Sequence, residues 1–143
     1  MWYEYLIQRH PAFFQDMARI PGQPFYPIAL GFECAEGWRE LLDKLLVDLQ
    51  IIYDALPEDR REGVCVVHQI KEKFGTLRFY ISTGTQEMYD RIDQAERDSA
   101  SICEKCGSPG KLHTGGWWLT LCPECALRLK RSSLEEEVPQ EDF

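Results

Sequence analysis

The sequence has no feature that would place the chain in a membrane or direct it out of the cell. No segment approaches the ~20 consecutive apolar residues that a transmembrane helix needs. Residues 1–5, MWYEY, lack the basic start and the apolar core of a signal peptide. The composition, with 44% hydrophobic and 28% charged residues, is typical of a folded globular protein. We therefore expect a cytoplasmic protein that has no membrane partner.

Recognisable catalytic motifs are also missing. The chain contains no glycine-rich loop of the kind that cradles phosphate, and no serine nucleophile elbow. Two isolated cysteines, Cys34 and Cys65, lack a base. On a strand Cys65 and His68 would point to opposite faces, and the flanking Glu33 and Glu36 would raise the pKa of the Cys34 thiol. We therefore expect no enzymatic activity, and a nuclease with carboxylates brought together by folding is the main enzymatic alternative.

An excess of positive charge is absent as well. The formal net charge is −8 at pH 7, and an acidic surface repels the phosphate backbone of nucleic acids. Much of this charge lies in residues 132–143, which contain Glu135, Glu136, Glu137, Glu141 and Asp142. Such blocks of like charge usually stay unfolded, so we expect an acidic, disordered tail there.

The hydrophobic pattern predicts an α+β fold. Apolar residues repeat at intervals of three and four between residues 38 and 56, which predicts an amphipathic helix. The period falls to two in residues 64–70 and 77–81, and Gly75 lies between them, so these runs predict a β-hairpin. A second amphipathic helix is expected over residues 86–101. This order of helices and strands predicts an α+β fold in which the helices pack on a small antiparallel hairpin sheet.

Two further expectations concern the residues that flank this pattern. Pro11 can occupy the first turn of a helix, which would cover residues 12–19. Three prolines within residues 21–27 exclude a regular helix and predict an ordered loop with its aromatic side chains folded inward. In the first run of the hairpin, strict alternation would place His68 and Ile70 on one face of the strand.

Four of the six cysteines form two close pairs with the spacing C-x2-C-x15-C-x2-C: Cys103, Cys106, Cys122 and Cys125. Two residues between cysteines let one tight turn direct both thiolates at one ion, and tetrahedral zinc prefers four such soft ligands. We expect one structural Zn²⁺ per chain, with no open coordination position. The alternatives are iron in a rubredoxin-like site, a chance pairing of the cysteines or a disulfide pair, and His113 as a substitute ligand.

The C-terminal part resembles a treble-clef zinc finger, in which a first knuckle, a β-hairpin and a second knuckle at a helix N-terminus follow one another. Treble clefs occur in nucleic-acid-binding proteins, enzymes and protein-interaction modules, so the fold alone does not decide the function. We therefore expect an α+β domain (residues 1–101), a zinc-binding unit packed on it (102–131) and the acidic tail (132–143).

Several motifs resemble those of a family of small, uncharacterised zinc-binding proteins of bacteriophages and prophages. The resemblance covers residues 30–125 and rests on Gly31-Phe32-Glu33-Cys34, Gly37-Trp38, Ile70 to Tyr80, the Cys103 knuckle and Gly116-Trp117-Trp118. It implies a location in the cytoplasm of a host cell but no particular mechanism. Members of that family often end the metal site with a histidine. This chain has Cys125 there, which changes the ligand set but keeps the site closed.

Basic and aromatic side chains mark two candidate partner-binding segments. Cations beside aromatic rings can hold a phosphate or stack on bases, although solvated surface charge has the same composition. The candidates are Lys71, Lys73, Phe74, Arg78 and Tyr80 in the hairpin, and Arg128, Lys130 and Arg131 after the last cysteine.

These observations favour a small zinc-stabilised accessory protein that acts by stoichiometric binding to a host protein, such as inhibition of a defence or regulatory complex. An acidic surface suits a basic protein partner because complementary potentials speed association. The alternative is a nucleic-acid-binding zinc protein that uses residues 71–80 and the helix after Cys125.

Overall fold

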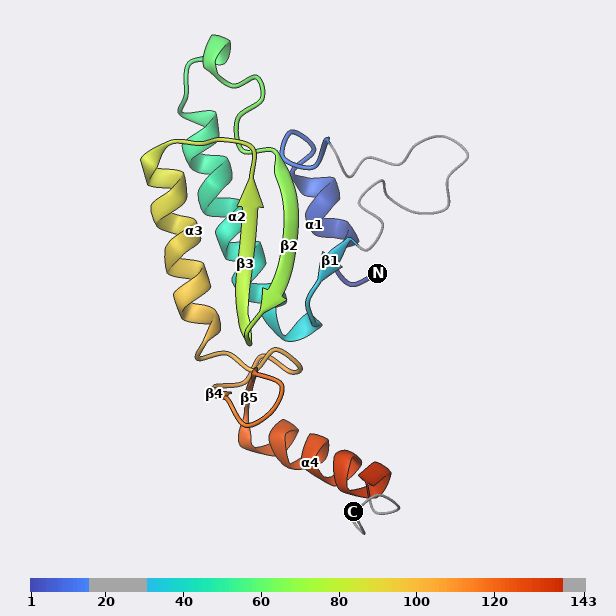
Figure 1. Cartoon of the computed structure of the whole chain (residues 1–143). Helices are drawn as coiled ribbons and strands as arrows, with labels where there is room; N and C mark the ends of the chain where they lie inside the picture. The colour runs from blue at the N-terminus through green and yellow to red at the C-terminus, as the bar shows by residue number, and fades with distance from the viewer. Residues whose placement is uncertain (16–30, 138–143) are drawn as a thin grey trace.

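The computed structural model describes residues 1–15 and 31–137, with side chains described as far as Lys130. Helices and strands are mixed, and they form one three-stranded and one two-stranded sheet (Figure 1). The helices are α1 (Glu4–Arg9), α2 (Arg39–Asp54), α3 (Gln86–Ser99) and α4 (Pro123–Glu137), with short 3-10 turns at Glu36–Trp38 and Glu58–Arg60. The strands are β1 (Phe32–Glu33), β2 (Val67–Lys73), β3 (Thr76–Ile81), β4 (Lys111–His113) and β5 (Leu119–Leu121). The predicted mixture of α and β structure is confirmed.

Helix α2 forms the base on which the larger sheet packs. Its leucine stripe is buried, as the three-and-four spacing predicts, and its other face carries charged residues. Figure 1 shows α2 behind the sheet and α3 beside strand β3. The two helices and the inner face of the sheet share one hydrophobic core, which includes Trp38, Leu46, Ile70 and Leu77. Among the described residues, none of the helices has the length and apolar character needed to cross a membrane.

Strands β2 and β3 form the predicted hairpin, but its turn is tighter than the sequence suggests. The segment expected to separate the strands, residues 71–76, is mostly strand, and only Phe74 and Gly75 form the turn. Both residues have positive φ, 53° and 83°, which is the combination that a two-residue turn needs to match the twist of the strands. Glycine adopts this conformation freely, whereas for a bulky residue such as Phe74 it is strained.

A β-bulge in β2 overturns the predicted alternation of its side chains. The register between β2 and β3 shifts between Val67 and Gln69, so one extra residue interrupts the two-residue period. Val67 and Ile70 are consequently buried together in the core, whereas His68 is exposed. The prediction that His68 and Ile70 share a face is therefore wrong.

The N-terminal part supplies the third strand, which the sequence did not indicate. Strand β1 pairs with β2 in parallel, with Phe32 opposite Ile70, so the sheet is not wholly antiparallel as expected. The Tyr3 ring stacks on Phe32 with 4.4 Å between centroids, which holds α1 against this strand. Helix α1, which the sequence did not predict, precedes Pro11. Residues 12–15 form turns, and the rest of the predicted helix, with the proline-rich loop, lies outside the described residues.

The outer edge of the sheet is capped by side chains of α3. In the β2–β3 ladder the backbone N–H groups of Leu77 and Phe79 point away from β2. The hydroxyl oxygen of Ser99 accepts the Leu77 N–H at 2.9 Å, and a carboxylate oxygen of Glu96 accepts the Phe79 N–H at 2.9 Å. Two otherwise unpaired donors of an edge strand are thereby satisfied.

We predict that Ser99→Ala lowers the free energy of unfolding by about 1–3 kcal/mol, because the buried Leu77 N–H would lose its acceptor. Chemical denaturation at fixed metal concentration measures this loss as a lower transition midpoint. Ser101→Ala is the matched control, because it removes the same hydroxyl group at an exposed position two residues away. Equal midpoints for the two variants would contradict the structural role of Ser99.

Candidate metal centre

The first cysteine pair lies on a tight turn that begins after helix α3. The N–H of Gly107 donates to the carbonyl of Cys103 at 2.9 Å, and the N–H of Cys103 donates to the carbonyl of Ser108 at 2.8 Å. Gly107 has a φ of 83°, which glycine adopts without strain. These bonds fold the chain back on itself so that Cys103 and Cys106 direct their sulfur atoms to the same side.

The second pair lies where strand β5 meets helix α4. Cys122 directly precedes the helix, and Cys125 lies in its first turn. The N–H of Cys125 donates to the Cys122 sulfur at 3.4 Å. A helix N-terminus favours negative charge because its free N–H groups point outward, so this is a suitable position for cysteines that bind a metal ion. Strands β4 and β5 pair antiparallel and bring this second pair to the first.

The four sulfur atoms of Cys103, Cys106, Cys122 and Cys125 lie within 4.8 Å of one another. The Cys106 and Cys122 sulfurs are 3.6 Å apart, whereas a disulfide requires about 2 Å. A tetrahedral site with metal–sulfur bonds of about 2.3 Å has sulfur atoms about 3.8 Å apart. The cysteines are therefore arranged to bind a metal ion, as predicted, and not as a disulfide pair.

The alternative ligand His113 is not a member of this group. It lies on β4 opposite Leu119, and the metal-binding group of the described residues consists of the four cysteines alone. Hydrogen bonds from the hydroxyl and the N–H of Ser108 lower the pKa of the Cys106 thiol to about 6, whereas burial and the hydrogen bonds among the cysteines raise the pKa of Cys125 to about 12. Metal ions bind the thiolate form, so metal binding would release the protons that the group still holds.

The first knuckle is fastened to the helical part of the molecule by its backbone. The N–H of Gly37 donates to the Glu104 carbonyl at 2.7 Å, and the indole N–H of Trp38 donates to the Ile102 carbonyl at 2.9 Å. A Cβ atom at Gly37 would overlap the carbonyl groups of Cys103 and Glu104. The approach is so close that only glycine fits at residue 37, and this accounts for the Gly-Trp pair in the sequence.

Glu104 strengthens the same junction with its side chain. One carboxylate oxygen accepts the N–H of Ala35 at 2.9 Å. Burial raises the pKa of this carboxyl, and the hydrogen bond from Ala35 partly offsets that effect. The side chain is 5% exposed, and its other oxygen has no hydrogen-bond partner in the described residues. Glu104 therefore links the knuckle to the segment that follows strand β1.

A second junction joins the two hairpins. The buried hydroxyl of Thr120, on β5, donates to the carbonyl of Gly75 at 2.7 Å, so the tip of the β2–β3 hairpin rests on the smaller sheet. The turn residue Phe74 meets Trp118 edge to face, with 5.9 Å between ring centroids. The metal-binding unit therefore holds the tip of the larger hairpin in place.

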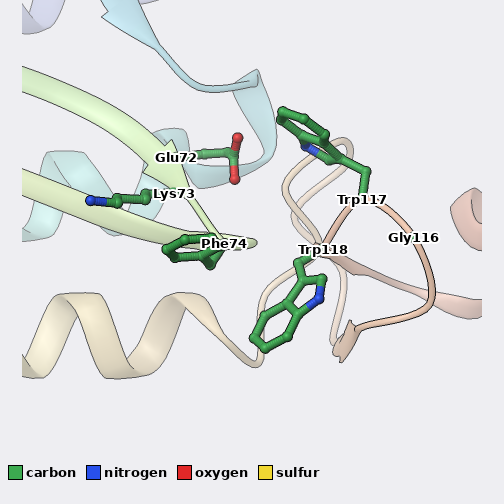
Figure 2. A pocket seen from close by; sticks show the side chains of 6 residues that line it. All are labelled: Glu72, Lys73, Phe74, Gly116, Trp117 and Trp118. Carbon is green, nitrogen blue, oxygen red and sulfur yellow. The ribbon is translucent and has the colours of Figure 1, made fainter.

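These junctions create an open hollow of about 570 Å³ beside the metal centre (Figure 2). It is lined by Glu72, Lys73, Phe74, Gly116, Trp117 and Trp118. Three of these are large aromatic residues with high exposure, 76% for Trp117, 63% for Phe74 and 43% for Trp118. Among the residues that line this hollow, the sequence predicted Lys73 and Phe74 as site residues but not the two tryptophans. Two adjacent tryptophans that follow two glycines in a short loop could have indicated an exposed aromatic site.

The other candidate residues of the hairpin lie apart from the hollow. Lys71 pairs directly with Arg78, and Gln69 pairs with Tyr80, so these side chains occupy the outer face of the sheet, opposite the core. Lys73 shares that face because residues two apart on a strand point the same way. Like charges directly opposite each other on a sheet are destabilising.

The basic residues after the last cysteine do not lie together, either at the hollow or on the outer face of the larger sheet. Arg128 forms an exposed ion pair with Glu124 one turn earlier on α4, an arrangement that contributes little stability. Lys130 lines a second hollow together with Trp117 and Leu127. The side chain of Arg131 lies outside the described part of the chain, while α4 itself continues to Glu137, past the expected start of the acidic tail.

The two isolated cysteines have no thiolate character. Burial raises the pKa of Cys65 to about 12. Burial, together with the charges of Glu104 and Glu72, raises the pKa of Cys34 to about 12. The sequence predicted the direction for Cys34 but attributed it to the neighbouring Glu33 and Glu36. Thiols in this state are poor nucleophiles.

Comparison of the chain with protein-family models, with curated proteins and with solved structures finds no match.

We predict that the purified protein contains one tightly bound metal ion per chain and that Cys122→Ser loses it, because three sulfur ligands leave the site incomplete. Elemental analysis after dialysis gives the metal content. Cys34→Ser, outside the group, should keep the full content. Protein prepared under reducing conditions that contains no metal would contradict this assignment.

We also predict that alkylation at pH 8 leaves Cys34 and Cys65 unmodified in the folded protein. With a pKa of about 12, their thiolate fraction at this pH is on the order of one in ten thousand. A strong chelator should expose the other four cysteines to the reagent without exposing these two. Mass spectrometry of proteolytic fragments locates the modified residues, and early labelling of Cys34 would contradict this prediction.

Proposed function

We propose that the four cysteines hold one structural zinc ion and that the chain is a zinc-stabilised module that binds another protein without turnover. Four thiolates complete the tetrahedral shell that zinc prefers, which leaves no position for a catalytic water. The order of knuckle, β4–β5 hairpin and knuckle at the start of α4 supports the proposal of a treble-clef finger. Zinc rather than iron in the elemental analysis would distinguish this site from a rubredoxin-like one.

The exposed aromatic residues around the metal centre are the observation that carries this proposal. Trp117, Trp118 and Phe74 line one hollow, and Trp117 also lines the second hollow beside Leu127 and Leu129 on α4. Exposed apolar side chains gathered in this way mark interaction surfaces, and tryptophan is enriched among the residues that dominate binding energy. A rigid metal centre would hold these rings in position before a partner arrives, which lowers the entropic cost of binding.

The chemistry of the remaining groups supports binding rather than turnover. The isolated thiols are held in their protonated form, and a metal site made of four cysteines is closed to substrate. Given the resemblance to small phage and prophage proteins, we propose that the partner is a host protein in the cytoplasm, with inhibition of a defence or regulatory complex as the biological outcome. Inhibition would then saturate near one equivalent of the chain.

One observation favours nucleic acid as the alternative partner. Lys71 and Arg78 lie directly opposite each other on the outer face of the sheet, and Lys73 and the exposed Tyr80 share that face. Among the described residues no carboxylate forms an ion pair with these cations. A phosphate could neutralise the like-charged pair, while Tyr80 could stack on a base. The net charge of −8 opposes this alternative.

We predict that Trp117→Ala weakens binding to the isolated partner by at least about 30-fold, which corresponds to the ~2 kcal/mol of a dominant interface residue. Calorimetry with the partner, first captured with the wild-type chain, measures both affinity and molar ratio. Tyr89→Ala is the matched control. It removes an exposed ring on α3 that lines neither hollow, and this variant should bind like the wild type.

Three results would refute the proposal. If the double variant Lys71→Ala with Arg78→Ala lost binding while Trp117→Ala kept it, the binding site would lie on the outer face of the sheet. Tight binding of duplex DNA or RNA at physiological salt would favour the nucleic-acid alternative. Complete modification of the partner by a substoichiometric amount of the chain would show that it is an enzyme.

A further inference from the structure

The hollow beside the metal centre has walls of two chemical kinds. Figure 2 shows the indoles of Trp117 and Trp118 and the ring of Phe74 arranged around an open centre, with the Glu72 carboxylate directed toward it. The rings come from two separate hairpins, and the carboxylate comes from strand β2. Aromatic faces carry partial negative charge, so every one of these groups attracts a cation.

The Glu72 carboxylate is held in position but is not neutralised. One of its oxygens accepts the N–H of Gly75 at 2.9 Å, which fixes the side chain against the hairpin turn. No lysine or arginine among the described residues forms an ion pair with it. Its charge also acts on the nearby Glu104 and Cys34. Glu72 therefore contributes to the hollow a negative charge that no ion pair within the described residues neutralises.

Lys73 lines the same hollow but does not fill it. Its ammonium group lies 5.7 Å from the centroid of the Phe74 ring, and in Figure 2 it points away from the two indoles. This contact shows that one ring of the cluster already receives a cation on its outer side. The space between Trp117, Trp118 and Glu72 stays open to a cation from outside.

The backbone around the hollow is shaped to present these rings to solvent. Phe74 occupies a left-handed conformation, with φ of 53°, that is unfavourable for a bulky residue. Gly116, with φ of 82°, precedes Trp117, whose ring is 76% exposed. Backbone strain and exposed aromatic surface both cost stability, and such features cluster at binding sites.

We propose that this hollow binds a lysine or arginine side chain on a peptide segment of the partner protein, with the cation between the indoles and paired with the Glu72 carboxylate. The inference rests on the proposed function and adds the chemistry of the partner. A cation over an aromatic ring is attracted by the ring quadrupole, and among the aromatic side chains tryptophan attracts it most strongly. A net charge of −8 on the chain attracts a basic segment in the same way.

The proposal can be tested with blocked amino acids, in which the backbone termini are neutral. N-acetyl-lysine methylamide and N-acetyl-arginine methylamide are the cationic probes, and N-acetyl-norleucine methylamide has a similar apolar chain without the charge. Indole N–H signals of the metal-loaded protein are followed by NMR and assigned with Trp117→Phe and Trp118→Phe. We expect saturable shifts of both signals with the cationic probes at millimolar concentration, and at least fivefold weaker binding of the norleucine probe.

Glu72→Gln isolates the role of the charge. The glutamine oxygen can still accept the Gly75 N–H, so the turn keeps its hydrogen bond. We expect this variant to bind the cationic probes several-fold more weakly and the norleucine probe equally well. Glu87→Gln, at an exposed position on α3, makes the same change in net charge away from the hollow and should bind all probes like the wild type.

The outcomes separate this inference from the function on which it rests. Equal binding of norleucine and lysine, no saturable shift, or no effect of Glu72→Gln would overturn the inference. If Trp117→Ala still abolished binding of the partner protein, the proposed function would survive that result. Indole signals that shift on dilution without any probe would show that a second copy of the chain occupies the hollow, which also overturns the inference.

Discussion

The contact between the first cysteine knuckle and the turn at residues 35–38 positions the C-terminal unit on the rest of the molecule. The backbone of Glu104 and that of Gly37 approach so closely that a side chain at Gly37 has no room. Trp38, entirely buried, contributes its indole N–H to the same junction. Because helix α2 begins directly after this turn, the metal-binding unit is attached to a helix whose leucine stripe lies in the core, and the geometry of the core extends into the metal centre.

Metal coordination and hairpin packing act together on the same surface. The cysteines join the two ends of the β4–β5 segment, and Thr120 on that segment receives the tip of the larger hairpin through Gly75. The loop that carries Trp117 and Trp118 thus leads into a strand that is held both by the Thr120 hydrogen bond and by Cys122, which directly follows it. In the proposed function the metal ion performs no chemistry, and its contribution is to hold aromatic residues that would otherwise collapse onto apolar surface.

The sequence predicted those features that depend on local spacing. The apolar repeat predicted α2 and α3, and Cys-x2-Cys spacing predicted the group of four cysteines. It did not predict the bulge between Val67 and Gln69 or the parallel pairing of β1, because both depend on contacts between distant segments. The hollow was missed for the same reason, since Phe74 and Trp118 are neighbours only after the two hairpins meet. The hairpin residues were predicted as one cluster, but Phe74 lies in the turn and contacts Trp118, whereas Lys71 and Arg78 pair with each other on the strands.

The capping of strand β3 by Ser99 and Glu96 restricts how a partner can engage the sheet. Many proteins are recognised by strand addition, in which a peptide pairs with the exposed backbone of an edge strand. Here the outward N–H groups of Leu77 and Phe79 already have acceptors on α3, so an incoming strand would have to displace a helix. At this edge of the sheet, strand addition is therefore disfavoured, and a partner there would have to contact side chains instead of backbone groups.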